Sequence, residues 1–283
     1  DLPMPSPFTF SIGDFTCSVV ADGAAEYPIE GLLERLDGSP ELMRDALERL
    51  HPEGTYQSAM NALLVQTPDG VVLVDTGNGP RGEPATGEVA RRVAEVLPRE
   101  QVDVVILTHG HGDHIGGLQD AEGNLAYPSA RYLMSAIEWE GLMGAVGRFA
   151  REPDDSYFRS RLLAIQPRLQ LVEGEEEAEA LPGVRLLPAP GHTLGHMVVL
   201  LQSRDERLLH LADTIHYPVQ FQEPSWSPNF DATTDLSVPN RQALLNLAAD
   251  DEGLLVMAYH FGFPGLGRVR REGEAFGWEE LAR

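Results

Sequence analysis

The segment that most constrains the fold is THGHGDHIGG, which spans residues 108–117. It places three of the nine histidines and one aspartate within six residues, separated by glycines. The apolar run VDVVILT (102–108) leads into this segment and has the length and β-branched content of a buried strand. A fold for this chain must therefore bring the end of a buried strand to a place where several imidazoles can gather.

The same arrangement recurs in the second half of the chain, where apolar runs typical of strands end close to residues that can bind metals. These runs are GVRLLPAP (183–190) before His192, RLLHLAD (207–213) with Asp213 at its end, and GLLVMAYH (253–260) with His260 at its end. Helices are predicted near 87–97 and over 240–250. Strands interleaved with helices favour an α/β fold in which helices cover the sheet faces. No linker divides the chain, so one domain spanning 1–283 is expected.

The first half predicts further strands and one helix start. Strands are expected around 8–12 and 15–20, and again over 61–67 and 70–76, where Pro68-Asp69-Gly70 forms the turn. Ser39-Pro40-Glu41 is typical of a helix N-terminus, with Pro40 at the first helical position. HMVVLLQS (196–203) is expected to pair antiparallel with 207–213. The acidic run 173–180 is expected in a solvated loop or at a helix edge.

Composition excludes several function classes. All 21 basic residues are arginine and the net charge is −23, so no footprint for nucleic acid is expected. Mechanisms that need a lysine are excluded. No apolar run reaches the roughly 18 residues of a membrane span. The first residues resemble no signal peptide, so a cytoplasmic location is expected, with a periplasmic or secreted one open if an upstream signal was removed. Cys17, the single cysteine, is expected to be buried and inert.

The histidine-rich segment can serve two metal ions. His109 and His111 are alternate residues, which face the same way on an extended loop. Asp113 and His114 follow one turn later and can reach a second ion. With His192, Asp213 and His260, the set holds five histidines and two aspartates, enough for two divalent ions with an open position. Zinc suits such ligands best, and cobalt, manganese or iron remain possible.

The order HxHxDH (109–114), GHTxGH (191–196), a strand-end aspartate and a late histidine resembles the metallo-β-lactamase superfamily. The resemblance implies a four-layer αββα sandwich with a dinuclear site at one edge. It implies a first metal bound by His109, His111 and His192, a second bound by Asp113, His114 and His260, and Asp213 as the bridge. Asp75, in VLVDTG, would orient a ligand histidine through its other ring nitrogen. His196 is expected to support the site or the core.

This ligand pattern favours hydrolysis. Divalent ions lower the pKa of coordinated water from 15.7 to about 7 and polarise a substrate oxygen. A hydroxide that bridges the metals would then attack an ester, lactone, amide or phosphoester, with Asp113 as proton shuttle. A redox role is less favoured, because diiron relatives place an acid where His111 stands. A protein that has become a binding module without catalysis normally loses some of the metal-ligating residues, and none is lost here. β-Lactamases need a cation beside the metals, often the lysine that this chain lacks, although an arginine could substitute.

Three segments resemble the subgroup of methyl parathion hydrolase and quorum-quenching lactonases: 8–23, 218–235 and 260–278. The resemblance implies neutral lactones and aryl esters as substrates, with promiscuous hydrolysis of organophosphate triesters, and a homodimer. A dedicated organophosphate hydrolase is the alternative.

Aromatic side chains are expected to line the substrate pocket. The candidates are Trp139, Phe158, Tyr217 and Phe261, with Trp226 and Phe263 as weaker ones; Trp139 and Phe158 could equally be core residues. Lactonases often carry a tyrosine three residues after the bridging aspartate. Here that position holds His216, followed by Tyr217, and either could approach the substrate oxygen. His216 is therefore a candidate catalytic residue beside Asp113.

Overall fold

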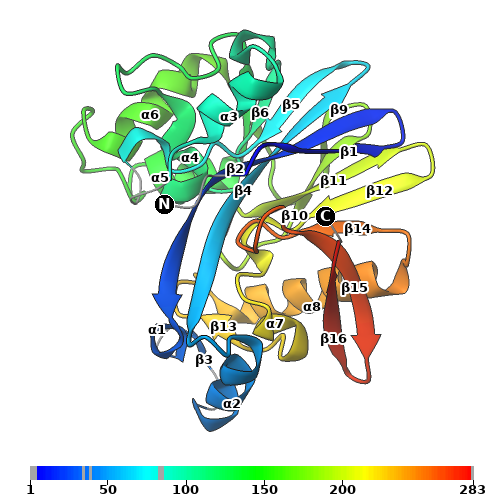
Figure 1. The fold of residues 1–283 in the computed structure, drawn as a ribbon. Coiled ribbons are helices and arrows are strands. Elements are labelled where there is room, and N and C mark those ends of the chain that lie inside the picture. Colours follow the sequence, from blue (N-terminus) through cyan, green and yellow to red (C-terminus); the bar gives the residue numbers. More distant parts are fainter. Residues whose placement is uncertain (1–4, 34–35, 38–39, 82–85, 282–283) are drawn as a thin grey trace.

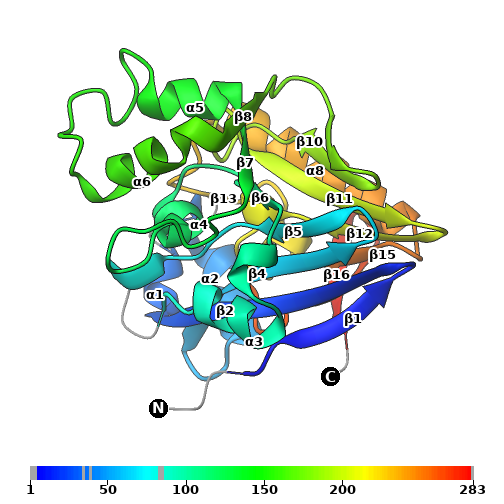
Figure 2. The same ribbon diagram turned by 90° about the horizontal axis from the view of Figure 1, so that it is seen from above.

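The computed structural model describes residues 5–33, 36–37, 40–81 and 86–281. Two seven-stranded sheets pack face to face, and helices lie on the outer side of each sheet (Figures 1 and 2). The strand order is β1-β2-β4-β5-β6-β7-β8 in the first sheet and β16-β15-β14-β12-β11-β10-β9 in the second. The predicted αββα sandwich is confirmed.

The first sheet combines an antiparallel half with a parallel half. Its strands are β1 (Phe8–Ile12), β2 (Phe15–Pro28), β4 (Thr55–Thr67), β5 (Gly70–Val74), β6 (Val104–Ile106), β7 (Arg131–Ser135) and β8 (Leu169–Val172). The pairs from β5 to β8 are parallel. Parallel strands are covered on both faces, which explains the unbroken apolar runs over 71–74 and 104–106. The covering helices are α3 (Val89–Val96), α4 (Gly112–Ile115), α5 (Ala136–Met143) and α6 (Tyr157–Ile165).

The second sheet is antiparallel except at one central pair. Its strands are β9 (Ala178–Leu181), β10 (Val184–Pro188), β11 (Met197–Ser203), β12 (Glu206–His210), β14 (Leu255–Met257), β15 (Leu266–Glu272) and β16 (Ala275–Glu280). The parallel pair is β12 with β14. Parallel neighbours need a crossover, and α8 (Thr234–Asp250) lies in this connection. The ends of β12 and β14 therefore lie side by side, which brings their following residues together.

The main core lies between the two sheets. Val74 and Ile106 of the first sheet belong to the same buried cluster as Val199 and Met257 of the second. Cys17 lies in this layer and is fully buried. Burial of apolar surface contributes about 25 cal/mol per Å², so this layer is the main source of stability for the strands that carry the site.

Several elements differ from the sequence-based expectations. β2 extends to Pro28, well beyond the expected 15–20, and with β4 forms a ribbon that projects from the sheet toward α1 (Ile29–Leu33) and α2 (Pro40–Leu50) (Figure 1). Helix α2 begins at Pro40, whereas Ser39 lies outside the described residues. The acidic run is not all loop, because its last residues begin the edge strand β9. Glu179 is exposed there, as is common on edge strands.

The remaining elements lie near the far end of that ribbon. They are the strand pair β3 (Leu36–Asp37) and β13 (Ser227–Pro228), and α7 (Val219–Gln222). Helix α8 starts at Thr234 and not at residue 240, so Pro239 lies inside it. Within the part of the chain that the structure describes, no helix combines the length and apolar character needed to cross a membrane.

Candidate metal centre

The predicted metal ligands come from four segments that follow strands. His109 and His111 lie on the loop after β6, and Asp113 and His114 lie in the short helix α4 that follows. The other three follow strands of the second sheet: His192 in the loop from β10 to β11, Asp213 in a 3₁₀ turn after β12, and His260 after β14. Residues of both sheets thus meet at one edge of the sandwich.

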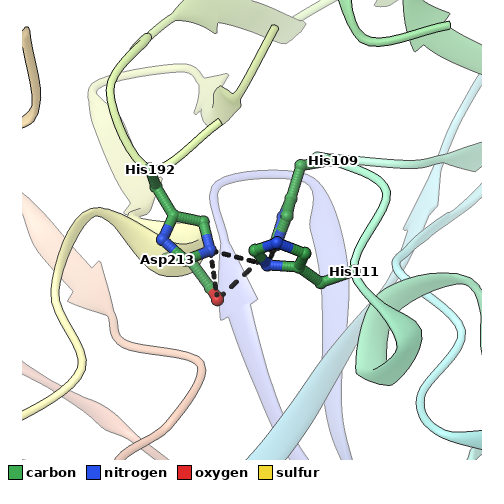
Figure 3. A group of neighbouring side chains, drawn as sticks. All are labelled: His109, His111, His192 and Asp213. Atoms are coloured by element: carbon green, nitrogen blue, oxygen red, sulfur yellow. Dashed lines mark hydrogen bonds and ion pairs between the residues drawn. The ribbon is translucent and has the colours of Figure 1, made fainter. Parts of the chain in front are cut away.

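The first group consists of His109, His111, His192 and Asp213 (Figure 3). Nδ1 of His111 lies 3.0 Å from Nε2 of His109 and 2.9 Å from Nε2 of His192. The Oδ2 atom of Asp213 lies 3.2 Å from Nε2 of His192 and 3.6 Å from Nε2 of His109. Three ring nitrogens and one carboxylate oxygen therefore point at a common centre.

The second group consists of Asp113, His114 and His260. Oδ2 of Asp113 lies 3.7 Å from Nε2 of His114 and 3.6 Å from Nε2 of His260. Asp213 reaches this group as well, with Oδ1 3.1 Å from Nε2 of His114 and Oδ2 3.3 Å from Nε2 of His260. The Asp213 carboxylate therefore lies between the two groups, where a bridge is expected.

The side chains of both groups fit divalent metal ions. Nε2 of His114 and Oδ1 of Asp213 are buried and, although 3.1 Å apart, are not aligned for a hydrogen bond, so neither has a hydrogen-bond partner. A buried polar atom left without a partner costs about 1–3 kcal/mol. A cation between the facing lone pairs would satisfy these atoms and remove the repulsion between the imidazoles. Nitrogen-rich ligands with a few carboxylates are those that zinc and related first-row metals bind.

Burial and mutual charge decide how these ligands hold protons. Burial, reinforced by the neighbouring His192, lowers the pKa of His111 to about 4. Burial also opposes protonation of His192, but its hydrogen bonds and charge attraction with Asp213 and Asp231 outweigh this and raise its pKa to about 9. Burial favours the neutral form of Asp213, yet the surrounding histidines, His114 foremost, hold its pKa well below the ordinary value. Metal binding would therefore displace a proton from His192.

Asp75 supports the histidine-rich loop and one histidine ring. It follows β5 with a φ of 62°. Its Oδ1 accepts a hydrogen bond from the Thr108 amide at 2.9 Å, and its Oδ2 accepts one from the Thr108 hydroxyl at 2.8 Å. Oδ2 also lies 2.8 Å from Nδ1 of His114, which leaves Nε2 facing the metal centre. This is the contact expected for Asp75, and its effect on metal binding stays a prediction.

His196 supports Asp213 through the backbone. Its Nδ1 donates to the carbonyl of Ala189 at 3.0 Å, and its Nε2 accepts from the amide of Asp213 at 3.1 Å. Burial lowers its pKa to about 3, which agrees with a ring that must stay neutral to accept that hydrogen bond. His196 therefore lies beside the centre as a support for Asp213.

A cleft opens onto the two groups. It has a volume of about 250 Å³, and its wall includes Tyr27, Ser58, Tyr217 and Phe230 beside the metal-group residues. A neighbouring hollow of about 280 Å³ shares Tyr27, Ser58, Asp113 and His260. No arginine lines either hollow among the described residues.

Both candidate catalytic side chains face this cleft. The side chain of Asp113 is 26% exposed. His216 is buried, with Nε2 3.1 Å from Oδ2 of Asp213 and its ring stacked on His260 at 5.1 Å between centroids. Each could therefore contact a molecule bound at the metal centre.

The predicted pocket aromatics are only partly placed at the cleft. Tyr217 lines it. Phe261 does not: it is 4% exposed and packs against Phe221 and Trp278 in the core of the second sheet. Trp139 and Phe158 pack against the core between the first sheet and its helices and line neither hollow. Phe261 is therefore a core residue, and the half-buried packing of Trp139 and Phe158 favours the core alternative for them.

The weaker pocket candidate Trp226 is also a core residue. It is buried with Tyr56 and Val219 under α2. Tyr27, Ser58 and Phe230 line the cleft and were missed. Tyr27 and Ser58 stand in no motif, and Tyr27 lies on the part of β2 beyond the expected strand end; Phe230 lies in the segment 218–235, but nothing within that segment distinguished it as a pocket residue.

Two acidic residues that sequence reasoning missed hold the ligand loops. Glu138, on α5, accepts from the Gly110 amide at 2.8 Å through Oε1, and from the Thr193 hydroxyl at 2.6 Å and the Gly195 amide at 3.2 Å through Oε2. Asp231 places Oδ1 2.9 Å from Nδ1 of His192. The spacing Ser135-x-x-Glu138 is a capping pattern and marks the helix start, but not the contact with both loops.

A family model described as the metallo-beta-lactamase superfamily matches residues 57–260. The chain belongs to this superfamily. The matched span contains every residue of the two metal groups. The resemblance found in HxHxDH and GHTxGH is thereby confirmed, and a His/Asp cluster in this fold agrees with the predicted metal-dependent hydrolase.

Curated relatives match part of the chain. It is 31% identical over 189 residues to a probable metallo-hydrolase of Mycobacterium tuberculosis, covering 56% of this chain and 57% of that relative. The alignment thus spans little more than half of the mycobacterial protein. This chain is also 27% identical over 195 residues to an N-acyl homoserine lactonase of Bacillus cereus, and the alignment covers 62% of this chain and 71% of the relative.

Two solved structures share the fold over nearly the whole chain. AidC, a dizinc quorum-quenching lactonase, superimposes with a TM-score of 0.85 at 24% identity and covers 99% of both chains. The hydrolase AbOPH superimposes with a TM-score of 0.83 at 22% identity and covers 98% of both. At these identities the likeness establishes the fold.

Proposed function

We propose that this protein is a metal-dependent hydrolase of lactones and other neutral carboxylic esters. The observation that carries the proposal is the Asp213 carboxylate, which lies within 3.6 Å of imidazole nitrogens from both metal groups at the base of a cleft. The names of the Bacillus relatives, N-acyl homoserine lactonases, support lactones as the substrate class.

Zinc is the proposed metal, with cobalt, manganese or iron as substitutes. His109, His111 and His192 would hold one ion, and Asp113, His114 and His260 the other, with Asp213 shared. When bound, such ions supply a nucleophile derived from water near neutral pH and a Lewis acid for the scissile carbonyl. The dizinc centre named for AidC supports this choice.

The side chains at the cleft can move a proton and orient the substrate. We assign Asp113 the role of taking a proton during attack and delivering it to the leaving alkoxide, because its side chain lines the cleft. The Tyr259 hydroxyl donates to the Asp113 carbonyl at 2.6 Å and so fixes this residue. His216 is held by Tyr56, whose hydroxyl donates to its carbonyl at 2.7 Å. We assign His216 the hydrogen bond to the substrate oxygen, with Tyr217 as its neighbour in the wall.

The wall of the cleft favours an uncharged substrate. Tyr27, Tyr217 and Phe230 supply aromatic surface, and the described lining contains no arginine that could pair with a carboxylate. Ligand pockets of this kind orient apolar groups with a few placed polar atoms. A β-lactam, which carries a carboxylate, is disfavoured. A neutral phosphotriester fits the same wall, so organophosphate hydrolysis is proposed as a side activity.

Initial rates on zinc-loaded protein test the proposal. The panel is a medium-chain homoserine lactone, 4-nitrophenyl acetate, paraoxon-methyl and a chromogenic cephalosporin. We expect kcat/KM for the lactone or the aryl ester to exceed that for the phosphotriester at least tenfold, about 1.4 kcal/mol of transition-state preference. The Asp213→Ala variant should lose this activity. A phosphotriester that leads the panel would overturn the substrate assignment, and wild-type rates in Asp213→Ala would overturn the metal mechanism.

A further inference from the structure

Asp231 and Arg241 form a charge pair behind the first metal group. Nη2 of Arg241 lies 3.2 Å from Oδ2 of Asp231, and both side chains are 0% exposed. Burying an ion costs several kcal/mol, so such a pair persists only where further hydrogen bonds satisfy it. The other hydrogen bonds of Asp231 and Arg241 are made with segments next to the metal groups.

Arg241, on α8, ties together two of these segments. Its Nε donates to the carbonyl of Thr214 at 2.8 Å, directly after Asp213. Its Nη1 donates to the carbonyl of Pro224 at 2.7 Å and to the hydroxyl of Ser227 at 3.2 Å. One guanidinium therefore connects the backbone beside the bridging aspartate with the segment that leads to Asp231.

Asp231 carries this connection to a metal-group histidine. Its Oδ1 lies 2.9 Å from Nδ1 of His192, while Nε2 of the same ring lies 2.9 Å from Nδ1 of His111. A carboxylate can only accept, so Nδ1 of His192 keeps its proton against Asp231, and Nε2 is the nitrogen whose proton a metal ion would displace. A partner on the far ring nitrogen sets tautomer and orientation in this way.

The backbone beside Asp231 holds the same loop. The amide of Ala232 donates to the carbonyl of His192 at 3.0 Å, and the amide of Thr233 donates to the carbonyl of Gly191 at 3.0 Å. Nδ2 of Asn240 donates to the carbonyl of Pro190 at 2.6 Å. The His192 loop is thus attached to the segment before α8 and to α8 itself, in addition to its own sheet.

We propose that Asp231 and Arg241 are positioning residues for the first metal ion. Asp231 selects the His192 tautomer that presents Nε2, and Arg241 holds the Asp231 carboxylate in place. The inference rests on the metal site of the proposed hydrolase and not on its substrate. A pair that only joined α8 to the loop would change stability when removed, but would leave metal affinity unchanged.

Metal titration of the wild type and two matched variants tests the proposal. Asp231→Asn keeps the size of the side chain and removes its charge. Asp250→Asn removes the charge of an aspartate at the end of α8, whose Oδ1 lies 2.7 Å from Nη2 of Arg271 at the surface. Metal-free proteins are titrated with Zn²⁺ against a chromophoric chelator. We expect Asp231→Asn to lower the affinity for one of the two ions about 10- to 100-fold, and Asp250→Asn to stay within twofold of the wild type.

A second measurement decides the matter if Asp231→Asn fails to fold. Imidazole ¹⁵N NMR of the zinc-loaded wild type should show the His192 proton on Nδ1. Wild-type affinity for both ions in Asp231→Asn, or a His192 proton on Nε2, would overturn the proposal. Neither readout uses a substrate, so failure to hydrolyse lactones would leave the positioning role intact. A wild type that binds no zinc would overturn the metal site and the positioning role with it.

Discussion

At the residue scale, most of the five metal-group histidines have a hydrogen-bond partner on the ring nitrogen that faces away from the metal centre. The far ring nitrogen faces Asp75 in His114, Asp231 in His192 and the carbonyl of Ala59 in His260, the last at 3.1 Å. A ring held on one side loses little rotational freedom when its other side binds a metal, so part of the entropy cost of binding is met during folding. The same partners fix which nitrogen remains free for the ion.

The burial of Cys17, which does not belong to the metal groups, leads to a prediction about its reactivity. Burial raises the pKa of its thiol to about 12, against an ordinary value of about 8.5. The thiolate is the reactive form, so the folded protein should not react with Ellman's reagent at pH 8. One equivalent per chain should react in denaturant, because Cys17 is the only cysteine. Rapid labelling of the native protein would contradict the burial.

The raised pKa of the Cys17 thiol also makes the free energy of unfolding depend on pH. The folded-state pKa is raised, so the contribution of the thiol to stability is fully present below about pH 8.5. It is lost as the pH rises from there toward 12, because the unfolded chain releases the proton first. Chemical denaturation at pH 8 and pH 10 should therefore show a lower free energy of unfolding at the higher pH. A Cys17→Ala variant, which cannot ionise there, should show a smaller decrease.

At the element scale, α5 holds the two loops of the first metal group against each other. Its Glu138 carboxylate accepts from Gly110 on one loop and from Thr193 and Gly195 on the other. α4 is fixed separately, because the amide and hydroxyl of Thr76 donate to the carbonyl of His114 at 2.9 and 2.8 Å. The loops depend on neighbours that are distant in sequence.

A Glu138→Gln substitution tests whether the carboxylate itself, and not helix α5 as a whole, holds the two loops together. The amide cannot accept through both terminal atoms, so at least one buried donor loses its partner, at a cost of about 1–3 kcal/mol. Urea denaturation measures this loss in free energy of unfolding. Glu140→Gln, at an exposed position of the same helix, should stay within about 0.5 kcal/mol of the wild type. Equal stabilities of the two variants would contradict the role.

Some residues of the site could be predicted from the sequence, and others could not. The seven metal-group residues could be predicted because each directly follows an apolar strand or belongs to one dense motif. Phe261 was misplaced for a local reason: it follows His260 in a turn after β14, and this turn directs its ring into the core against Phe221. Glu138 and Asp231 could not be assigned, because their partners are 28 and 39 positions away.

At the scale of the whole molecule, the metal groups join the two sheets. His109, His111, Asp113 and His114 follow the first sheet, whereas His192, Asp213 and His260 follow the second. Ions bound between them would act as cross-links at the open edge of the sandwich. Without such ions, buried imidazoles and carboxylates converge there with unsatisfied atoms, which weakens the contact between the two sheets at this edge.

Removing the metal should therefore lower the thermal stability of the whole chain. Binding to the folded state alone contributes about 4 kcal/mol when the free metal exceeds Kd a thousandfold. At roughly 2–4 °C per kcal/mol for a domain of this size, chelation should lower Tm on the order of 10 °C. Differential scanning fluorimetry of zinc-loaded, chelated and reconstituted protein measures the shift, and reconstitution should restore Tm. Asp213→Ala should melt near the chelated wild type and respond little to zinc, because it lacks the carboxylate that both groups share. Equal Tm values with and without metal would mean that the sheets are held together by the apolar core alone.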